Sequence, residues 1–125
     1  MKKIILAALA GLLLSGPAGA EVKVITASTD LKYICERIGG ELVKVESLAS
    51  GDQDLHMVEP RPSMVFKLKK ADVVVRVGLD LDMWLDSPIN AAKNGRLFYG
   101  QPGYVDASVG IPLLEKPEGK VDASM

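Results

Sequence analysis

The feature that most constrains the fold is a nearly continuous apolar run in the middle of the chain, Val73-Val74-Val75-Arg76-Val77. A strand that is apolar at almost every residue, rather than at every second one, is typical of the interior of a parallel sheet, where helices cover both faces. Parallel strands have to be joined by long crossover connections, and these are usually helices. The run therefore predicts an α/β fold in which further strands alternate with helices.

Strand and helix signals do alternate on both sides of this run. The predicted strands are 22–26, 42–48, 73–77 and 104–108, and the predicted helices are 29–38, 62–71 and 83–93. This order predicts a four-stranded parallel sheet, formed by residues 21–108, with helices on both faces. In such sheets, ligands bind outside the carboxyl ends of the strands.

The first helix is predicted from the spacing of Leu31, Ile34, Cys35 and Ile38, which places these residues on one face. We expect this face to be buried and Gly39-Gly40 to end the helix. Cys35 has no second cysteine to pair with, so no internal disulfide can form. Among core residues its thiol is expected to be inert, because apolar surroundings raise a thiol pKa.

Prolines and aspartates mark the limits of the other two helices. Pro62 suits the first position of the second helix, whereas Pro88 is expected to end or kink the third helix early. Asp80 and Asp82 lie between the third strand and the third helix. They are candidates for site carboxylates, but capping of the following helix is the more common role for such residues.

Residues 1–20 are predicted to be a secretory signal peptide. Lys2 and Lys3 precede the apolar stretch 4–14, and Ala18-Gly19-Ala20 suits a cleavage site. The apolar stretch is too short for a transmembrane helix. The prediction is a soluble periplasmic protein that begins at Glu21 and is not inserted in the membrane after the leader is removed.

Composition argues against two classes of function. Cleavage of the leader removes two lysines and leaves 13 basic and 16 acidic residues, a net charge of −3. Nucleic-acid-binding domains usually carry a clustered basic face, so no nucleic-acid partner is predicted. With one histidine, no evident pair of nucleophile and base and no glycine-rich phosphate loop, the sequence predicts no catalytic residues, no enzyme activity and no organic cofactor.

The single histidine, His56, lies in the stretch 54–60, just before the helix that Pro62 opens. Two prolines at the exit restrict the backbone, so the imidazole is presented by a stiffened loop. This loop leaves the carboxyl end of strand 42–48, where the architecture places binding sites. A neutral imidazole is the commonest protein ligand for Zn²⁺. Two interpretations remain open here, a metal ligand and a solvent-facing histidine without a task, because one ligand does not make a metal site.

Three segments carry a resemblance. They are Thr29-Asp30-Leu31 with Ile38-Gly39-Gly40, the stretch 54–63, and the block from Lys70-Ala71-Asp72 through Gly78-Leu79 to Trp84-Leu85-Asp86. Together, over residues 22 to about 117, the chain resembles the metal-specific substrate-binding proteins of ABC transporters, the zinc- and manganese-uptake group. Residues 54–63 resemble the first-ligand motif of this family, with Leu55 in place of its proline and Val58 in place of its aromatic residue.

The resemblance implies a receptor of two lobes joined by one long helix, with the metal bound between the lobes by four side chains. It implies that His56 is the first of these ligands, that zinc or manganese is the transported metal, and that an ABC permease in the inner membrane is the partner. It also implies that residues 21–125 are an incomplete N-terminal lobe, without the linking helix and the C-terminal lobe. We therefore expect a truncated chain that carries a half-site.

Two other classes of function are compatible with the same pattern. One is a two-lobe binding protein for an anion or an organic solute, in which backbone amides at helix N-termini bind the ligand. The other is a stand-alone single-lobe interaction module. Loss of His56 separates the first from a metal receptor, because anion binding would survive it. Cooperative folding of residues 21–125 and metal-free binding of a partner would identify the second.

Overall fold

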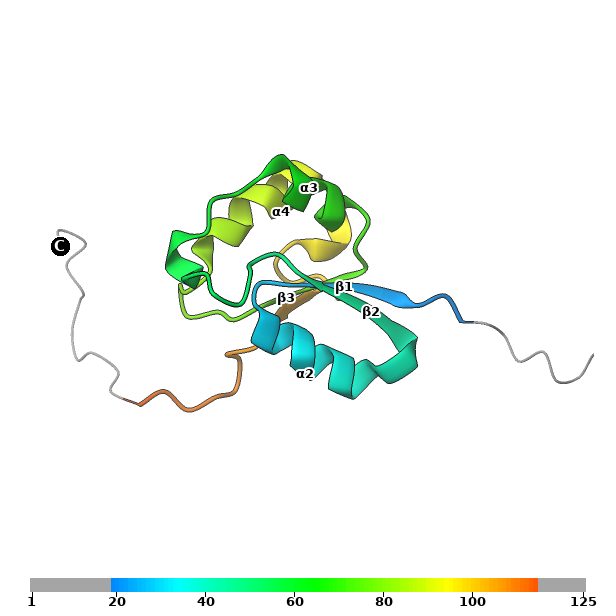
Figure 1. The fold of residues 1–125 in the computed structure, drawn as a ribbon, viewed down its shortest axis with the longest axis horizontal. Helices are drawn as coiled ribbons and strands as arrows, with labels where there is room; N and C mark the ends of the chain where they lie inside the picture. The colour runs from blue at the N-terminus through cyan, green and yellow to red at the C-terminus, as the bar shows by residue number, and fades with distance from the viewer. Residues whose placement is uncertain (1–18, 115–125) are drawn as a thin grey trace, which may run out of the picture.

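The computed structural model describes residues 19–114, which form one sheet of four parallel strands with helices on both faces (Figure 1). The strands are β1 (Val22–Thr26), β2 (Val43–Ser47), β3 (Val73–Arg76) and β4 (Tyr104–Asp106), in the order β2-β1-β3-β4. The helices are α2 (Thr29–Gly39), α3 (Pro62–Lys69) and α4 (Asp86–Ala92). The predicted α/β fold and its four-stranded parallel sheet are confirmed. Residues 1–18 of the predicted leader lie outside the described residues.

Within residues 19–114 there are also four short 3-10 helices. They are η2 (Gly40–Leu42), η3 (Leu55–Met57), η4 (Met83–Leu85) and η5 (Gly95–Leu97). None of the helices within residues 19–114 combines the length and the hydrophobicity that crossing a membrane would require.

β3 lies inside the sheet between β1 and β4, as its apolar sequence predicts. Val74 is in register with Ile25 of β1, and both side chains are buried. Because successive side chains of a strand point to opposite faces, Ile25 and Val74 belong to the core under α3 and α4, whereas Val24 and Val75 belong to the core under α2. The sheet therefore separates two apolar cores.

Helix α2 covers one face of the sheet, but not with the whole face that its sequence predicts. The Ser28 hydroxyl caps its first turn by accepting a hydrogen bond from the backbone N–H of Leu31 at 3.3 Å. Leu31 and Cys35 pack on the sheet core, whereas Ile34 is 49% and Ile38 82% exposed. The prediction that this face is buried is wrong. Leu31 and Cys35 are partly buried and no residue of α2 is fully buried, because only the side of the stripe that carries these two residues faces the sheet.

Helices α3 and α4 cover the opposite face and pack against each other. Met64 and Leu68 of α3 are buried, as the predicted stripe requires, and so is Ile89 of α4. Pro88 does not end the third helix, which is a correction. It is the third residue of α4, where a backbone N–H has no partner within the helix, and α4 continues to Ala92.

We predict that the exposed side chains of α2 promote self-association, because adjacent exposed apolar residues favour contacts that remove them from water. Light scattering after size exclusion at several concentrations is expected to show a mass above that of the monomer. The variant Ile38→Lys is expected to move the protein towards the monomer and to change the unfolding free energy by no more than about 0.5 kcal/mol, as for other exposed sites. A monomer at every concentration tested would contradict this.

Candidate metal site

His56 is the middle residue of η3, in the connection that leaves the carboxyl end of β2. In Figure 1 this turn lies at the left end of the sheet, where α2 also begins and where the chain leaves β4. All four strands are parallel, so their carboxyl ends meet at this edge. The His56 loop therefore lies at the carboxyl ends of the strands, as the order of strands and helices predicts. That His56 binds a metal stays a prediction.

Asp54 holds the backbone and the side chain of His56 with one carboxylate oxygen. Its Oδ1 accepts a hydrogen bond from the backbone N–H of His56 at 2.9 Å and lies 3.2 Å from the imidazole Nδ1. These contacts, the backbone hydrogen bond first, lower the pKa of the Asp54 carboxyl below its usual value. A proton on Nδ1 would be donated to this carboxylate, which leaves the lone pair on Nε2. Metal-binding histidines are oriented in the same way in proteins.

A small apolar core supports the His56 loop from below. Its buried members are Ala49, Val58 and Met64, and Leu55 and Trp84 pack against them. Leu55 and Val58 are the two residues that depart from the family motif. Both contribute apolar surface to this core, so the imidazole between them is carried on an anchored turn even though a proline is absent at position 55.

A buried ion pair shapes the neighbouring turn, which follows β3. Arg76 is 8% exposed, and its Nε lies 3.2 Å from the carboxylate of the fully buried Asp82. The other oxygen of Asp82 accepts a hydrogen bond from the backbone N–H of Val77 at 2.6 Å. Asp82 makes no capping hydrogen bond, so the expected capping role is wrong for this residue. Asp80 is exposed in the same turn.

Two further groups complete the shell of Arg76. Its Nη1 donates to Asp86 at 2.7 Å and to the Tyr104 hydroxyl at 2.8 Å. Burial lowers the pKa of Arg76, but the hydrogen bonds to Tyr104 and Asp86 and the charges of Asp82 and Asp86 outweigh it and raise the pKa above the usual value. The signal for this cluster in the sequence is a charged residue inside the apolar run 73–77, because a buried charge needs partners.

The turns after β3 and β4 are packed directly against each other. Gly78 has a φ of 87°, and a Cβ at this position would overlap the carboxylate of Asp106 and lie 2.5 Å from the Ser108 hydroxyl. Asp106 in turn accepts hydrogen bonds from the backbone N–H and the hydroxyl of Ser108, at 2.9 and 2.6 Å. Position 78 therefore requires glycine, because its φ is positive and because a side chain would overlap Asp106.

The part of the chain from residue 19 to 114 does not assemble a full set of metal ligands. No group of three His, Cys, Asp or Glu residues within it is arranged to hold an ion. Cys35 is half-buried on α2, and burial, with a smaller effect of the Glu36 charge, raises its thiol pKa. The structure therefore offers one oriented imidazole at the carboxyl edge.

The chain is similar to several proteins of metal uptake. Residues 24–123 match the sequence model of the ZnuA family, described as zinc-uptake complex component A, periplasmic. Over 117 residues the chain is 32% identical to the high-affinity zinc uptake system protein ZnuA of Haemophilus influenzae, a match that covers 93% of this chain and 34% of that protein. Over 113 residues it is 28% identical to the manganese ABC transporter substrate-binding lipoprotein PsaA of Streptococcus anginosus, covering 84% and 35%.

The fold has a counterpart among solved structures. A crystal structure of ZnuA superposes with a TM-score of 0.62 at 28% sequence identity and covers 77% of this chain and 35% of that one. The chain thus spans about a third of the length of these relatives.

We predict that Asp82→Asn lowers the free energy of unfolding by about 3 kcal/mol, because it leaves the buried guanidinium of Arg76 without its main internal counter-charge. Asp80→Asn makes the same change in an exposed residue of the same turn and is expected to cost no more than about 0.5 kcal/mol. Urea denaturation followed by circular dichroism measures both. Equal effects of the two variants would contradict the assignment of the ion pair.

Proposed function

The chain belongs to the ZnuA family of periplasmic zinc-uptake components. On this premise we propose that the protein captures a divalent transition metal in the periplasm and delivers it to an ABC permease in the inner membrane. The metal is zinc or manganese, since one of the relatives described above is a zinc uptake protein and another belongs to a manganese transporter. The metal is cargo, so the role is transport rather than catalysis.

The observation that carries this proposal is the Asp54–His56 pair at the carboxyl edge of the sheet. The side chain of His56 is 65% exposed, so its Nε2 is accessible to an ion from outside. The carboxylate of Asp54 engages Nδ1 and the backbone of the same residue, which fixes the direction of the ring. The backbone contact also caps η3, so the contact with Nδ1 is the one that supports a metal ligand.

His56 supplies one ligand of the proposed site. Zinc in proteins takes about four ligands, and manganese takes more, mostly oxygens. Within residues 19–114 the imidazole has no partner set that would hold an ion without further donors. The remaining ligands are therefore proposed to come from a part of the protein that these residues do not include, so that His56 contributes a half-site.

The division of the chain follows from the same proposal. Residues 1–20 act as a signal peptide that is removed on export, and residues 21–125 form the N-terminal lobe of a two-lobe receptor. The apolar support under the His56 loop belongs to this lobe, so the lobe positions the first ligand before the metal arrives. In such a receptor the second lobe closes the site over the ion.

The test uses a chimera in which residues 21–125 replace the corresponding third of the Haemophilus influenzae protein. Competition with a fluorescent chelator measures zinc and manganese affinity. We predict that His56→Ala weakens binding by at least about a hundredfold. Asp54→Asn keeps a side-chain oxygen that can cap η3 but removes the negative charge beside Nδ1, and it is expected to weaken binding by about tenfold. The loss of groups that orient metal ligands typically costs 10- to 100-fold.

Asp52→Asn is the matched control, because Asp52 is an exposed aspartate of the same loop. It is expected to leave the affinity unchanged. Tight binding by a chimera that carries His56→Ala would show that His56 is not a ligand. Equal losses for Asp52→Asn and Asp54→Asn would show that the loop contributes only its negative charge.

A further inference from the structure

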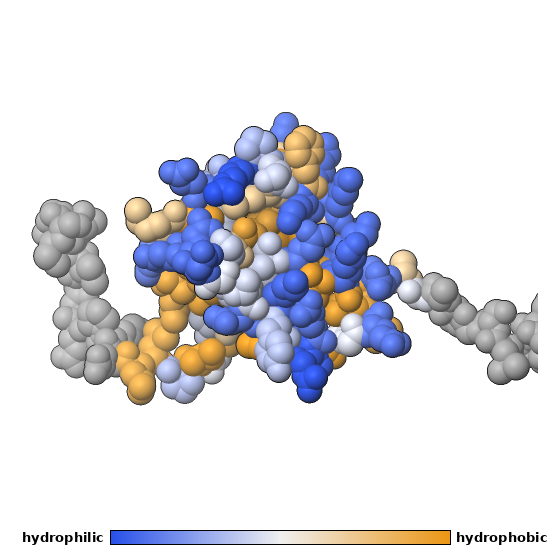
Figure 2. All heavy atoms as spheres, viewed as in Figure 1, coloured by the Kyte–Doolittle hydropathy of each residue, from blue (hydrophilic) through white to orange (hydrophobic). Residues whose placement is uncertain are grey.

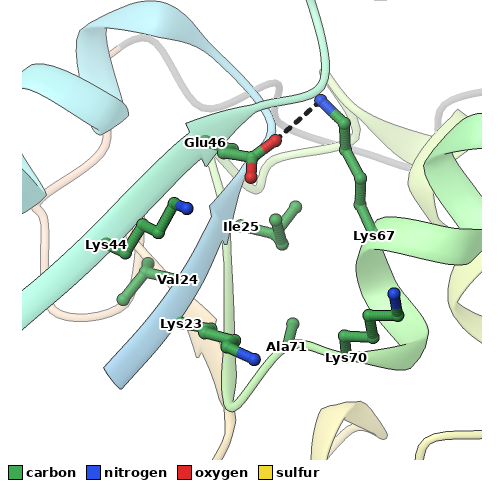
Figure 3. A pocket seen from close by; sticks show the side chains of 8 residues that line it. All are labelled: Lys23, Val24, Ile25, Lys44, Glu46, Lys67, Lys70 and Ala71. Atoms are coloured by element: carbon green, nitrogen blue, oxygen red, sulfur yellow. Dashed lines mark ion pairs between the residues drawn. The ribbon is translucent and has the colours of Figure 1, made fainter. Parts of the chain in front are cut away.

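A hollow that is rich in lysine indicates a second site, separate from the candidate metal site. The hollow lies between α3 and the strands β1 and β2, and Figure 3 shows the residues around it. Lys23 and Lys44 come from the first halves of β1 and β2, and Lys67 and Lys70 come from the end of α3 and the residue after it. Three stretches that are distant in sequence thus contribute four lysines to the lining of one hollow.

The charges in the hollow are not balanced. Glu46 of β2 is its one carboxylate, and it is paired with Lys67 at 2.9 Å. The other three lysines make no ion pair with any residue in the range 19–114. The whole chain carries a formal charge of −1, so this surplus of three positive charges is a local concentration and not a reflection of the composition.

The lysines lower the pKa of Glu46, the acidic residue among them. The pKa of Glu46 is lowered, first by its hydrogen bond with Lys67 and also by the charges of Lys67 and Lys44, although burial acts in the opposite direction. Glu46 therefore stays ionised and remains occupied with Lys67. A ligand would meet the three remaining ammonium groups.

We propose that this hollow binds a phosphate-bearing anion, whose oxygens contact Lys23, Lys44 and Lys70. Lysine binds phosphate as a point charge with three donors, and several lysines around one hollow suit an anion of more than one negative charge. The cavity measures about 210 Å³. Since a water molecule takes up about 30 Å³ of liquid volume, there is room for a phosphate group together with some of its water.

The hollow is separate from the candidate metal site. Lys23 and Lys44 are close to the amino-terminal ends of their strands, whereas His56 lies beyond the carboxyl end of β2. A surplus of ammonium groups repels a divalent cation, so the hollow is not a second metal site. The two sites therefore call for ligands of opposite charge.

The test measures anion binding by the purified protein at an ionic strength of about 0.15 M, where exposed charges more than about 8 Å apart are screened. Calorimetry with inorganic diphosphate, accompanied by amide chemical shifts, is expected to give one site and shifts centred on Ile25 and Ala71. The double variant Lys44→Gln, Lys70→Gln is expected to weaken binding by about tenfold, since hydrogen bonds between charged groups are the strong ones.

Two further variants make the test specific. Lys69→Gln removes the same charge from the same helix, but Lys69 does not line the hollow, so it is expected to leave the affinity unchanged. Glu46→Gln removes the internal counter-charge of Lys67 and is expected to tighten binding by about twofold to fivefold, the range of exposed charge pairs. Circular dichroism checks that all variants are folded.

A second arm separates a free anion from a lipid headgroup as the source of the phosphate. It uses co-sedimentation with vesicles of phosphatidylglycerol in phosphatidylcholine, compared with phosphatidylcholine alone. Binding to the anionic vesicles that diphosphate displaces, and that the double variant loses, assigns the lipid source; calorimetric binding without vesicle binding assigns a free anion. Absence of both, or equal losses for Lys69→Gln and the double variant, overturns the proposal.

Discussion

The buried charge of Arg76 is the constraint on which the carboxyl edge depends. A guanidinium does not give up its proton in a protein, so a fold that buries it has to surround it with acceptors. Asp82 is the fully buried acceptor, and it can reach Arg76 only if the chain turns back directly after β3. That turn contains Leu79 and Asp80 with positive φ, which the ion pair compensates. It then delivers Trp84 to the small core under the His56 loop.

The two ends of the sheet thus differ in how they are built. At the carboxyl edge, backbone turns are fixed by buried polar contacts, and a single imidazole is oriented by a neighbouring carboxylate. Around the lysine hollow, by contrast, long side chains from regular elements surround open space, with one internal ion pair. The first arrangement favours one defined geometry, which a metal ion needs, and the second adapts to the shape of its ligand. Figure 2 shows that hydrophilic and hydrophobic residues are interspersed on the face of the molecule that it presents.

The sequence was sufficient for the sheet because apolar runs and helix signals alternate without ambiguity, and the order of strands then determines which loops share an edge. It was not sufficient for Ile34 and Ile38, since periodicity tells which residues share a face but not how wide the covering surface is. For Asp82 the sequence favours a cap over a site carboxylate, because aspartate often precedes a helix. A cap contributes about 1 kcal/mol, and the buried guanidinium six residues earlier is the stronger competitor for its carboxylate. The position of His56 at the carboxyl edge follows from the strand order, whereas the lysine hollow joins residues from three stretches of the chain, so no local pattern reveals it.

The close approach at Gly78 has a consequence for whatever follows β4. Because the turn after β3 leaves no room beside Asp106 and Ser108, the chain emerges from β4 at a fixed point of the edge that also carries His56. β4 and β2 are the outer strands of the sheet, so this exit and the His56 loop lie at the same end of the sheet but on opposite sides of it. A donor on the residues after β4 would be tethered to the same lobe as His56, so its effective concentration there would be set by the length of the tether and not by the amount of protein.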